Sequence, residues 1–131
     1  MKVSSFLPIL CLVTLCSATP KVTETASKEA FPLVHDQQVA SIYYSENDYP
    51  VVAISAQLFA SDIERVTSRP ATIRQAKRLN QLERRPAVIV GTIGQSDLID
   101  ELVAKKLINV DTIIGKWEAS LTTTILHPHT R

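Results

Sequence analysis

The stretch Val88–Asp97, VIVGTIGQSD, decides the fold of this chain. An apolar run leads into Gly91 and Gly94 and then into Ser96, a residue type that favours the start of a helix. A strand, a glycine turn and a helix in this order are typical of α/β domains, and also of nucleotide-binding loops that hold phosphate at a helix N-terminus. The stretch is therefore either a phosphate-binding loop or a tight structural turn.

The spacing favours the structural turn. GTIGQS lacks the glycine-to-lysine spacing of a P-loop, and no lysine follows directly after Gly94 to reach a phosphate. It also lacks the G-x-G-x-x-G pattern, and Asp111 stands where a helix ends rather than where a ribose would be bound. We therefore predict no cofactor, and nucleotide binding through 91–96 stays a distant alternative.

The flanking segments predict a small α/β domain with the order β-α-β-α-β, in which helices pack on a mixed or parallel sheet. The predicted strands are Val39–Tyr44, Pro86–Ile93 and Trp117–Leu126. The second of them is apolar enough to be a central strand buried on both faces.

Two helices complete this prediction. Pro50–Thr67 has an apolar stripe at helical spacing, to which Val52, Phe59, Ile63 and Val66 belong. The second helix follows the Ser96 cap, with acidic residues in its first turns. Residues 71–85, ATIRQAKRLNQLERR, are basic and could bind a polyanion, but no aromatic residue offers a stacking platform for bases. We interpret them as a solvated connector with some helix.

The first 18 of the 131 residues are predicted to be a signal peptide. Lys2 supplies a positive charge, Phe6–Cys16 is an apolar run, and small residues precede a cleavage site after Ala18. Both cysteines lie in this segment, so the mature chain has none and must rely on core burial. Residues 19–30 are polar and predicted to be flexible, and the protein is expected to be secreted.

The charge balance gives no general attraction to nucleic acid or to an anionic membrane. The whole chain has 14 basic and 13 acidic residues, and removal of Lys2 with the signal peptide makes the two numbers equal. We therefore expect neither nucleic acid nor a membrane as a partner.

Three ordered motifs carry a resemblance to a known family. They are ENDYPVVAISAQLFASDIERVTSRP (residues 46–70), AVIVGTIGQSDLIDELVAKKLI (87–108) and IIGKWEAS (113–120). Together they resemble the N-terminal domain of glycoside hydrolase family 115, whose members are xylan α-1,2-glucuronidases. The resemblance covers about Phe31 to Thr124. One departure is Ser68, which stands where the family has a glycine at a left-handed helix exit.

The resemblance implies an incomplete accessory domain over 31–126, followed by a divergent tail, 127–131. In the family the chain continues into a TIM-type barrel that carries the substrate pocket and the catalytic acids. The complete enzyme is thus expected to remove (4-O-methyl-)glucuronic acid branches from glucuronoxylan, with the missing barrel as the partner of this domain. We expect the chain alone to be inactive and prone to self-association, with xylan as a further candidate partner.

No catalytic, cofactor-binding or metal-binding residue is predicted. Asp62 and Glu64 point in different directions on a helix, while the acids that begin the second helix, Asp97, Asp100 and Glu101, are explained by the helix dipole. A histidine lies near the start of the domain, and the tail holds His-Pro-His, which has too few ligands for a closed metal site. These histidines are His35, His127 and His129.

Trp117 follows Ile113-Ile114 and is interpreted as a core residue rather than a platform for a sugar ring. The alternative to the accessory domain is a free-standing secreted module that binds carbohydrate or a partner through Trp117 or its sheet surface.

Overall fold

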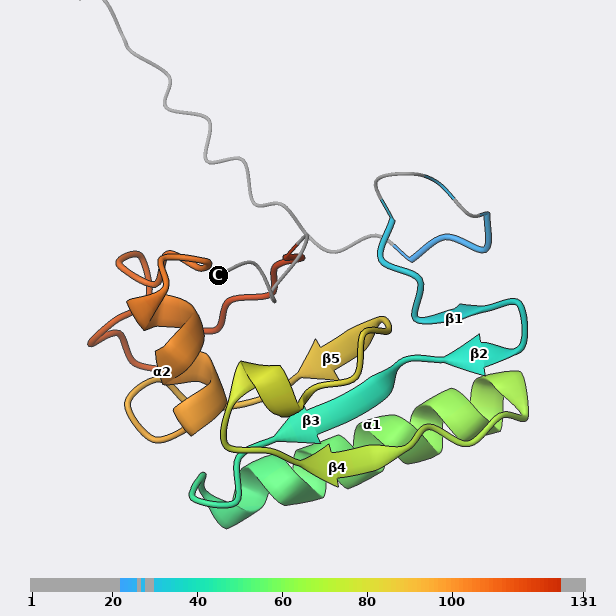
Figure 1. Ribbon diagram of the computed structural model, residues 1–131, viewed down its shortest axis with the longest axis horizontal. Helices are drawn as coiled ribbons and strands as arrows, with labels where there is room; N and C mark the ends of the chain where they lie inside the picture. The colour runs from blue at the N-terminus through green and yellow to red at the C-terminus, as the bar shows by residue number, and fades with distance from the viewer. Residues whose placement is uncertain (1–21, 26, 28–29, 126–131) are drawn as a thin grey trace, which may run out of the picture.

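A parallel sheet of three strands lies at the centre of the fold (Figure 1). The computed structural model describes residues 22–25, 27 and 30–125. The middle strand is β3 (Ser41–Tyr44), and β4 (Ile73–Gln75) and β5 (Ala87–Ile89) pair with it on either side. Helices and parallel strands in one small domain confirm the predicted α/β class.

The two faces of the sheet have separate cores because successive side chains of β3 point to opposite faces. Ile42 is fully buried on the face covered by α1 (Pro50–Thr67). Tyr43 is buried on the other face, which is covered by η1 (Leu79–Gln81) and α2 (Asp97–Ala104). The sheet is therefore the middle layer of an α/β/α arrangement.

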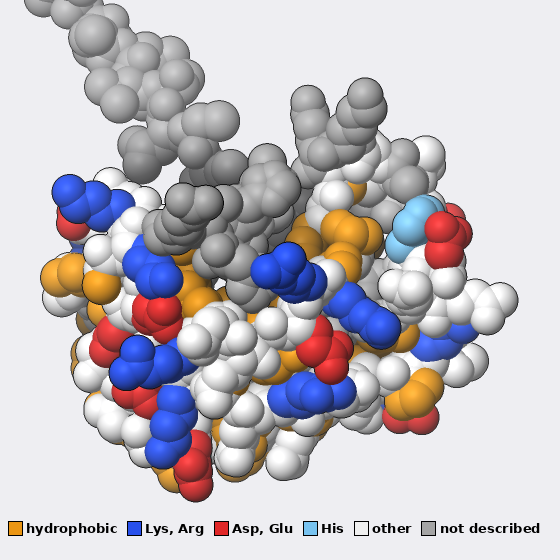
Figure 2. Space-filling view, viewed as in Figure 1, with side chains coloured by type: hydrophobic (Ala, Val, Ile, Leu, Met, Phe, Trp, Pro, Cys, Tyr) orange, Lys and Arg blue, Asp and Glu red, His pale blue; other side chains and the backbone are white. Residues whose placement is uncertain are grey.

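Helix α1 has the predicted bounds, and its buried stripe contains two of the four predicted residues, Val52 and Ile63. Its buried residues are Val52, Ala56, Ala60 and Ile63. The predicted stripe members Phe59 and Val66 are 38% and 85% exposed. Since the sheet beneath has only three short strands, one narrow stripe is covered, and the small alanines let the helix approach closely. Apolar side chains reach the surface along the lower edge of Figure 2, the side on which α1 lies.

The segment interpreted as a solvated connector with some helix, 71–85, does contain a short helix, η1, but it also contains the strand β4, which was not predicted. Ile73 stands opposite Ile42 across the ladder, and Arg74 stands opposite Tyr43. Pairing with the buried middle strand makes this segment extended although its own residues have little strand preference. Arg74 is exposed at the sheet edge, where charged side chains are common.

The second predicted strand, Pro86–Ile93, corresponds to β5, which is shorter than predicted and lies at a different position in the sheet. β5 occupies three residues of Pro86–Ile93, is only partly buried, and lies at an edge rather than at the centre. The apolar run reflects contact with both cores, since Val88 packs with the α1 layer and Ile89 with the α2 layer.

The predicted third strand, Trp117–Leu126, is absent from its described part, 117–125. That segment has turns and irregular backbone, and positive φ angles occur just before it at Gly115 (69°) and within it at Glu118 (53°). A left-handed residue at each point breaks the extended conformation that a strand needs. The other two strands, β1 (Val34–His35) and β2 (Gln38–Val39), form a small antiparallel hairpin.

Helix α1 ends in the left-handed conformation, with Ser68 at φ 56° and its N–H donating to Glu64 O at 2.7 Å. A serine there is strained, so Ser68→Gly is expected to raise the free energy of unfolding by about 0.5–1 kcal/mol. Urea unfolding of both proteins measures this change. Ser55→Gly, at an exposed position inside α1, is the matched control and is expected to lower stability by about 0.5 kcal/mol. A loss of stability in Ser68→Gly contradicts the strained exit.

Candidate functional site

The carboxyl ends of the three parallel strands meet at one edge of the sheet, which is where open α/β sheets bind ligands. The chain leaves β3 toward β4 through α1, whereas β5 lies on the other side of β3. The loop after β3, residues 45–49, and the glycine turn after β5, residues 90–96, therefore face each other across this edge. This edge is the first candidate site.

Asp48 ties the two loops together. Its carboxylate accepts the backbone N–H of Thr92 at 2.8 Å and the N–H of Tyr49, next in sequence, also at 2.8 Å. Gln95 makes a second hydrogen bond between the two loops, because its side-chain amide donates to Asn47 O at 2.8 Å. The first and second motifs of the sequence thus form one hydrogen-bonded unit.

The glycine turn is filled by the protein's own carboxylates. Gly94 N–H donates to Asp100 at 2.7 Å, and Thr92 N–H is taken by Asp48. The N–H groups of Gln95 and Ser96 both donate to Thr92 O, at 3.2 and 2.9 Å. A bound phosphate would have to displace these contacts, so the geometry supports the structural turn over the phosphate loop.

Gly91 is required by close packing rather than by ligand approach. A Cβ built on it would lie 2.4 Å from Ser96 Oγ and 2.7 Å from Ile99 Cγ1. Ser96 stands at the N-cap of α2 as predicted, but its side chain makes no capping hydrogen bond. Its Oγ is buried and has no partner in the described part of the chain, and the side chain packs closely against Gly91 in the turn after β5.

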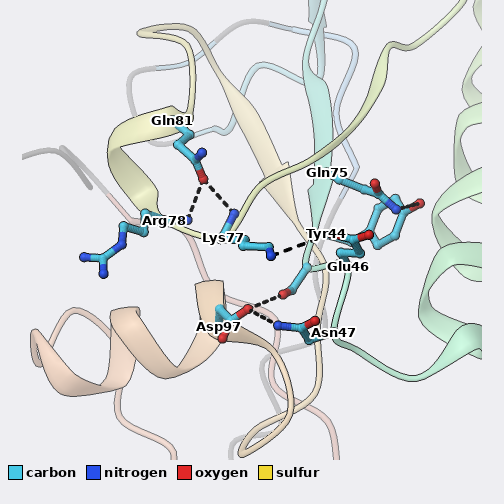
Figure 3. Close-up of polar contacts among 9 residues, drawn as sticks. Tyr44, Glu46, Asn47, Gln75, Lys77, Arg78, Gln81 and Asp97 are labelled. Carbon is cyan, nitrogen blue, oxygen red and sulfur yellow. Dashed lines mark hydrogen bonds and ion pairs between the residues drawn. The ribbon is translucent and has the colours of Figure 1, made fainter.

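Asp97 is the first residue of α2, and its side chain faces the loop after β3 (Figure 3). Its Oδ2 accepts hydrogen bonds from Ser45 Oγ at 3.0 Å and from Asn47 Nδ2 at 2.9 Å. A cavity of about 420 Å³ beside it is lined by Asn47, Lys77, Arg78, Asp97 and Glu101. Lys77 reaches Glu46 only at 3.8 Å, and the Arg78 guanidinium points away from this cluster.

Glu101 links α2 to η1. One carboxylate oxygen accepts Leu79 N–H at 2.8 Å, and the other lies 3.1 Å from Lys105 Nζ. Burial acts to raise the pKa of Glu101, but the hydrogen bond from Leu79 and the nearby Lys105 outweigh it and lower the pKa below the ordinary glutamate value. The charged form of Glu101 therefore stabilises the fold.

The structure places the acids considered in the sequence at two locations. Asp97 and Asp100 lie together in the first turn of α2, where they accept the hydrogen bonds described above. Asp62 and Glu64 are exposed on α1, and Asp62 pairs with Arg65 at 3.5 Å. The acids of the carboxyl edge are held by backbone and side-chain donors, which gives them a structural role.

Trp117 is 90% exposed, so its prediction as a core residue was wrong. The turn at Gly115 carries the chain out to the surface instead of into a strand. His35 is exposed in β1, while His127 and His129 lie outside the described residues. Within residues 22–125, apart from 26 and 28–29, no three His, Cys, Asp or Glu side chains are placed to hold a metal ion.

No protein-family model matches the chain, and no curated protein matches it. Among the described helices, none is both long and apolar enough to cross a membrane. Sequence reasoning missed Asp48 and Asn47, whose signal is an acidic loop directly after the first strand of an α/β pattern.

The contact between Asp48 and the glycine turn is testable. Asp48→Asn replaces one acceptor oxygen with an NH₂ group that faces a backbone N–H, so we expect a loss of about 1–3 kcal/mol in the free energy of unfolding. Urea denaturation provides the measurement. Asp62→Asn, an exposed acid in a weak ion pair, is the control and should change stability by less than about 0.5 kcal/mol. Equal effects in both variants contradict this role of Asp48.

The lowered pKa of Glu101 predicts a pH dependence. Its contribution to stability is complete above the unfolded glutamate pKa of about 4.3, and is lost as the pH falls through the lower folded value. Glu101→Gln is therefore expected to be less stable than the wild type at pH 7, and the difference should shrink below about pH 4. Thermal unfolding of both proteins from pH 3 to 7 measures it. A difference that stays constant over this range contradicts a charged-state contribution.

Proposed function

We propose that this chain is the accessory N-terminal α/β domain of a secreted glycoside hydrolase that resembles family 115. In this proposal the removal of (4-O-methyl-)glucuronic acid from glucuronoxylan takes place in a separate barrel domain, outside residues 31–126. The domain docks on that barrel and performs no catalysis itself.

The observation that carries the proposal is the hydrogen bond between Asp48 and Thr92 N–H. It joins the D-Y-P motif to the G-T-I-G motif, the two stretches on which the resemblance mainly depends. Asn47 and Gln95, from the same two stretches, make a second connection. Because these motif residues hydrogen-bond to one another, their role in the two stretches is accounted for by stabilising the fold, and no catalytic role is needed.

The carboxylates of the carboxyl edge support the absence of catalysis in this part. An inverting glycosidase needs one acid that gives a proton and one base that activates water across an open sugar site. Asp48 and Asp100 each accept a backbone N–H of the glycine turn, and Asp97 accepts two side-chain donors. These three carboxylates therefore stabilise the glycine turn and the loop after β3.

The outer side of α1 supports docking on another surface. Val51, Ile54 and Leu58 are 61%, 54% and 63% exposed and recur at spacings of three and four, so they lie along one side of the helix. Exposed apolar residues that lie together are typical of surfaces that another protein covers. The same stripe accounts for the expected tendency to self-associate.

The test is release of glucuronic acid from glucuronoxylan by the purified chain, followed by chromatography of the products. We expect no release above the buffer blank, because the acids of this domain are structural. Asp100→Asn and Glu118→Gln are assayed in parallel. Release by the wild type that either substitution abolishes contradicts the proposal and places an active site in this domain.

A second candidate function, a free-standing carbohydrate-binding module, is favoured by the exposure of Trp117. An exposed indole can stack on a sugar ring. Binding of the chain to insoluble xylan, lost in Trp117→Ala and retained in Tyr49→Ala, supports this candidate. Tyr49 is a suitable control because it is an exposed aromatic residue, 54% accessible, in another part of the fold.

A further inference from the structure

A larger cavity, of about 730 Å³, lies at the opposite end of the sheet. Its walls include Ser41, Thr72 and Pro86, which begin or directly precede the three parallel strands. The β1–β2 hairpin adds its turn, Asp36-Gln37, where both residues have positive φ. This volume is in the range of small-molecule sites.

Three arginines from separate segments line this cavity. Arg69 follows the exit of α1, Arg74 belongs to β4, and Arg85 comes shortly before β5. They converge because the amino ends of parallel strands lie at one edge of the sheet. A charge run along one exposed helix would not bring such distant residues together.

The positive charge of the cavity is only partly neutralised in the described part of the chain. Arg74 Nη2 lies 2.9 Å from Glu83 Oε1, and the other lining acid, Asp36, lies 3.2 Å from His35. Arg69 reaches only a backbone oxygen, that of Gln37, at the limiting distance of 3.5 Å. Arg85 has no carboxylate within 4.0 Å among residues 30–125.

We propose that this cavity binds a small multivalent oxyanion, which Arg69 and Arg85 hold through their planar guanidinium groups. Carboxylate and phosphate share the oxygen geometry that arginine binds with two parallel hydrogen bonds. Gln38, Ser41 and Thr72 add neutral hydrogen-bonding groups to the walls.

The lining favours a small anion over a nucleic acid, because no Phe, Tyr or Trp is among its described residues, and its one aromatic ring, that of His35, lies 3.2 Å from Asp36. Near the middle of the face in Figure 2, basic side chains gather around an acidic one, in agreement with a local basic site on an otherwise mixed surface. The inference goes beyond the accessory role, because it concerns a different end of the sheet from the motif network.

Isothermal titration of the full chain at about 0.15 M ionic strength, where the Debye length is about 8 Å, tests the site with pyrophosphate and citrate as separate probes and glucose as the neutral control. Saturable binding of one or both anions is expected, and the probe that binds more tightly identifies phosphate or carboxylate as the preferred chemistry. Arg85→Gln and Arg69→Gln should each weaken binding about tenfold. Glu83→Gln should strengthen it by releasing Arg74.

Arg84→Gln is the matched control, because it removes the same charge from an exposed neighbour that does not line the cavity. It should change the affinity less than about twofold, since exposed charges are screened. The proposal is overturned if neither anion binds, if glucose binds equally well, or if Arg84→Gln weakens binding as much as Arg85→Gln. Tighter binding of a single-stranded oligonucleotide than of either probe also overturns it.

Discussion

The fold depends on pairing along both edges of one four-residue strand, β3. Ile42 and Tyr43 are almost completely buried, each at the centre of a different core cluster. Every other layer is placed by this strand, since α1 packs on the Ile42 side and η1 and α2 pack on the Tyr43 side. Because neighbouring strands are parallel, their loops are sorted into two ends of the sheet. The chemistry of the molecule follows from that sorting.

The two ends differ in how their charges are satisfied. At the carboxyl end Asp48 and Asp100 accept N–H groups of the glycine turn, and Asp97 accepts hydrogen bonds from the loop after β3. At the amino end the excess is positive, and Arg85 keeps unused donors in the described part of the chain. The N–H groups of a glycine turn that resembles a phosphate loop in sequence are thus already bonded within the protein. The basic segment 71–85 supplies two of the three arginines, Arg74 and Arg85, that line the cationic cavity.

Helix α1 and the strand that ends at Tyr44 could be predicted because their signals are local. Pro50 suits the first turn of a helix, and it begins a helix of 18 residues. β4 could not be predicted, since Arg74 and Gln75 become extended only by pairing with β3. The position of β5 at an edge is also a property of the whole sheet. Trp117 was misplaced because its apolar neighbours suggested a strand, whereas positive φ angles at Gly115 and Glu118 form a turn.

The site shows the same division between local and long-range signals. The acids of α2 were recognised as helix-start residues, and that interpretation was sound for Asp97 and Asp100, but their acceptor roles depend on loops about fifty residues earlier in the chain or on the turn before the helix. The cationic cavity depends on three segments that only the sheet brings together. Composition alone gives a nearly neutral chain, because it averages the three arginines of this cavity with acidic residues elsewhere in the sequence. Net charge is therefore a poor guide to binding by this domain, which depends on where the charges gather.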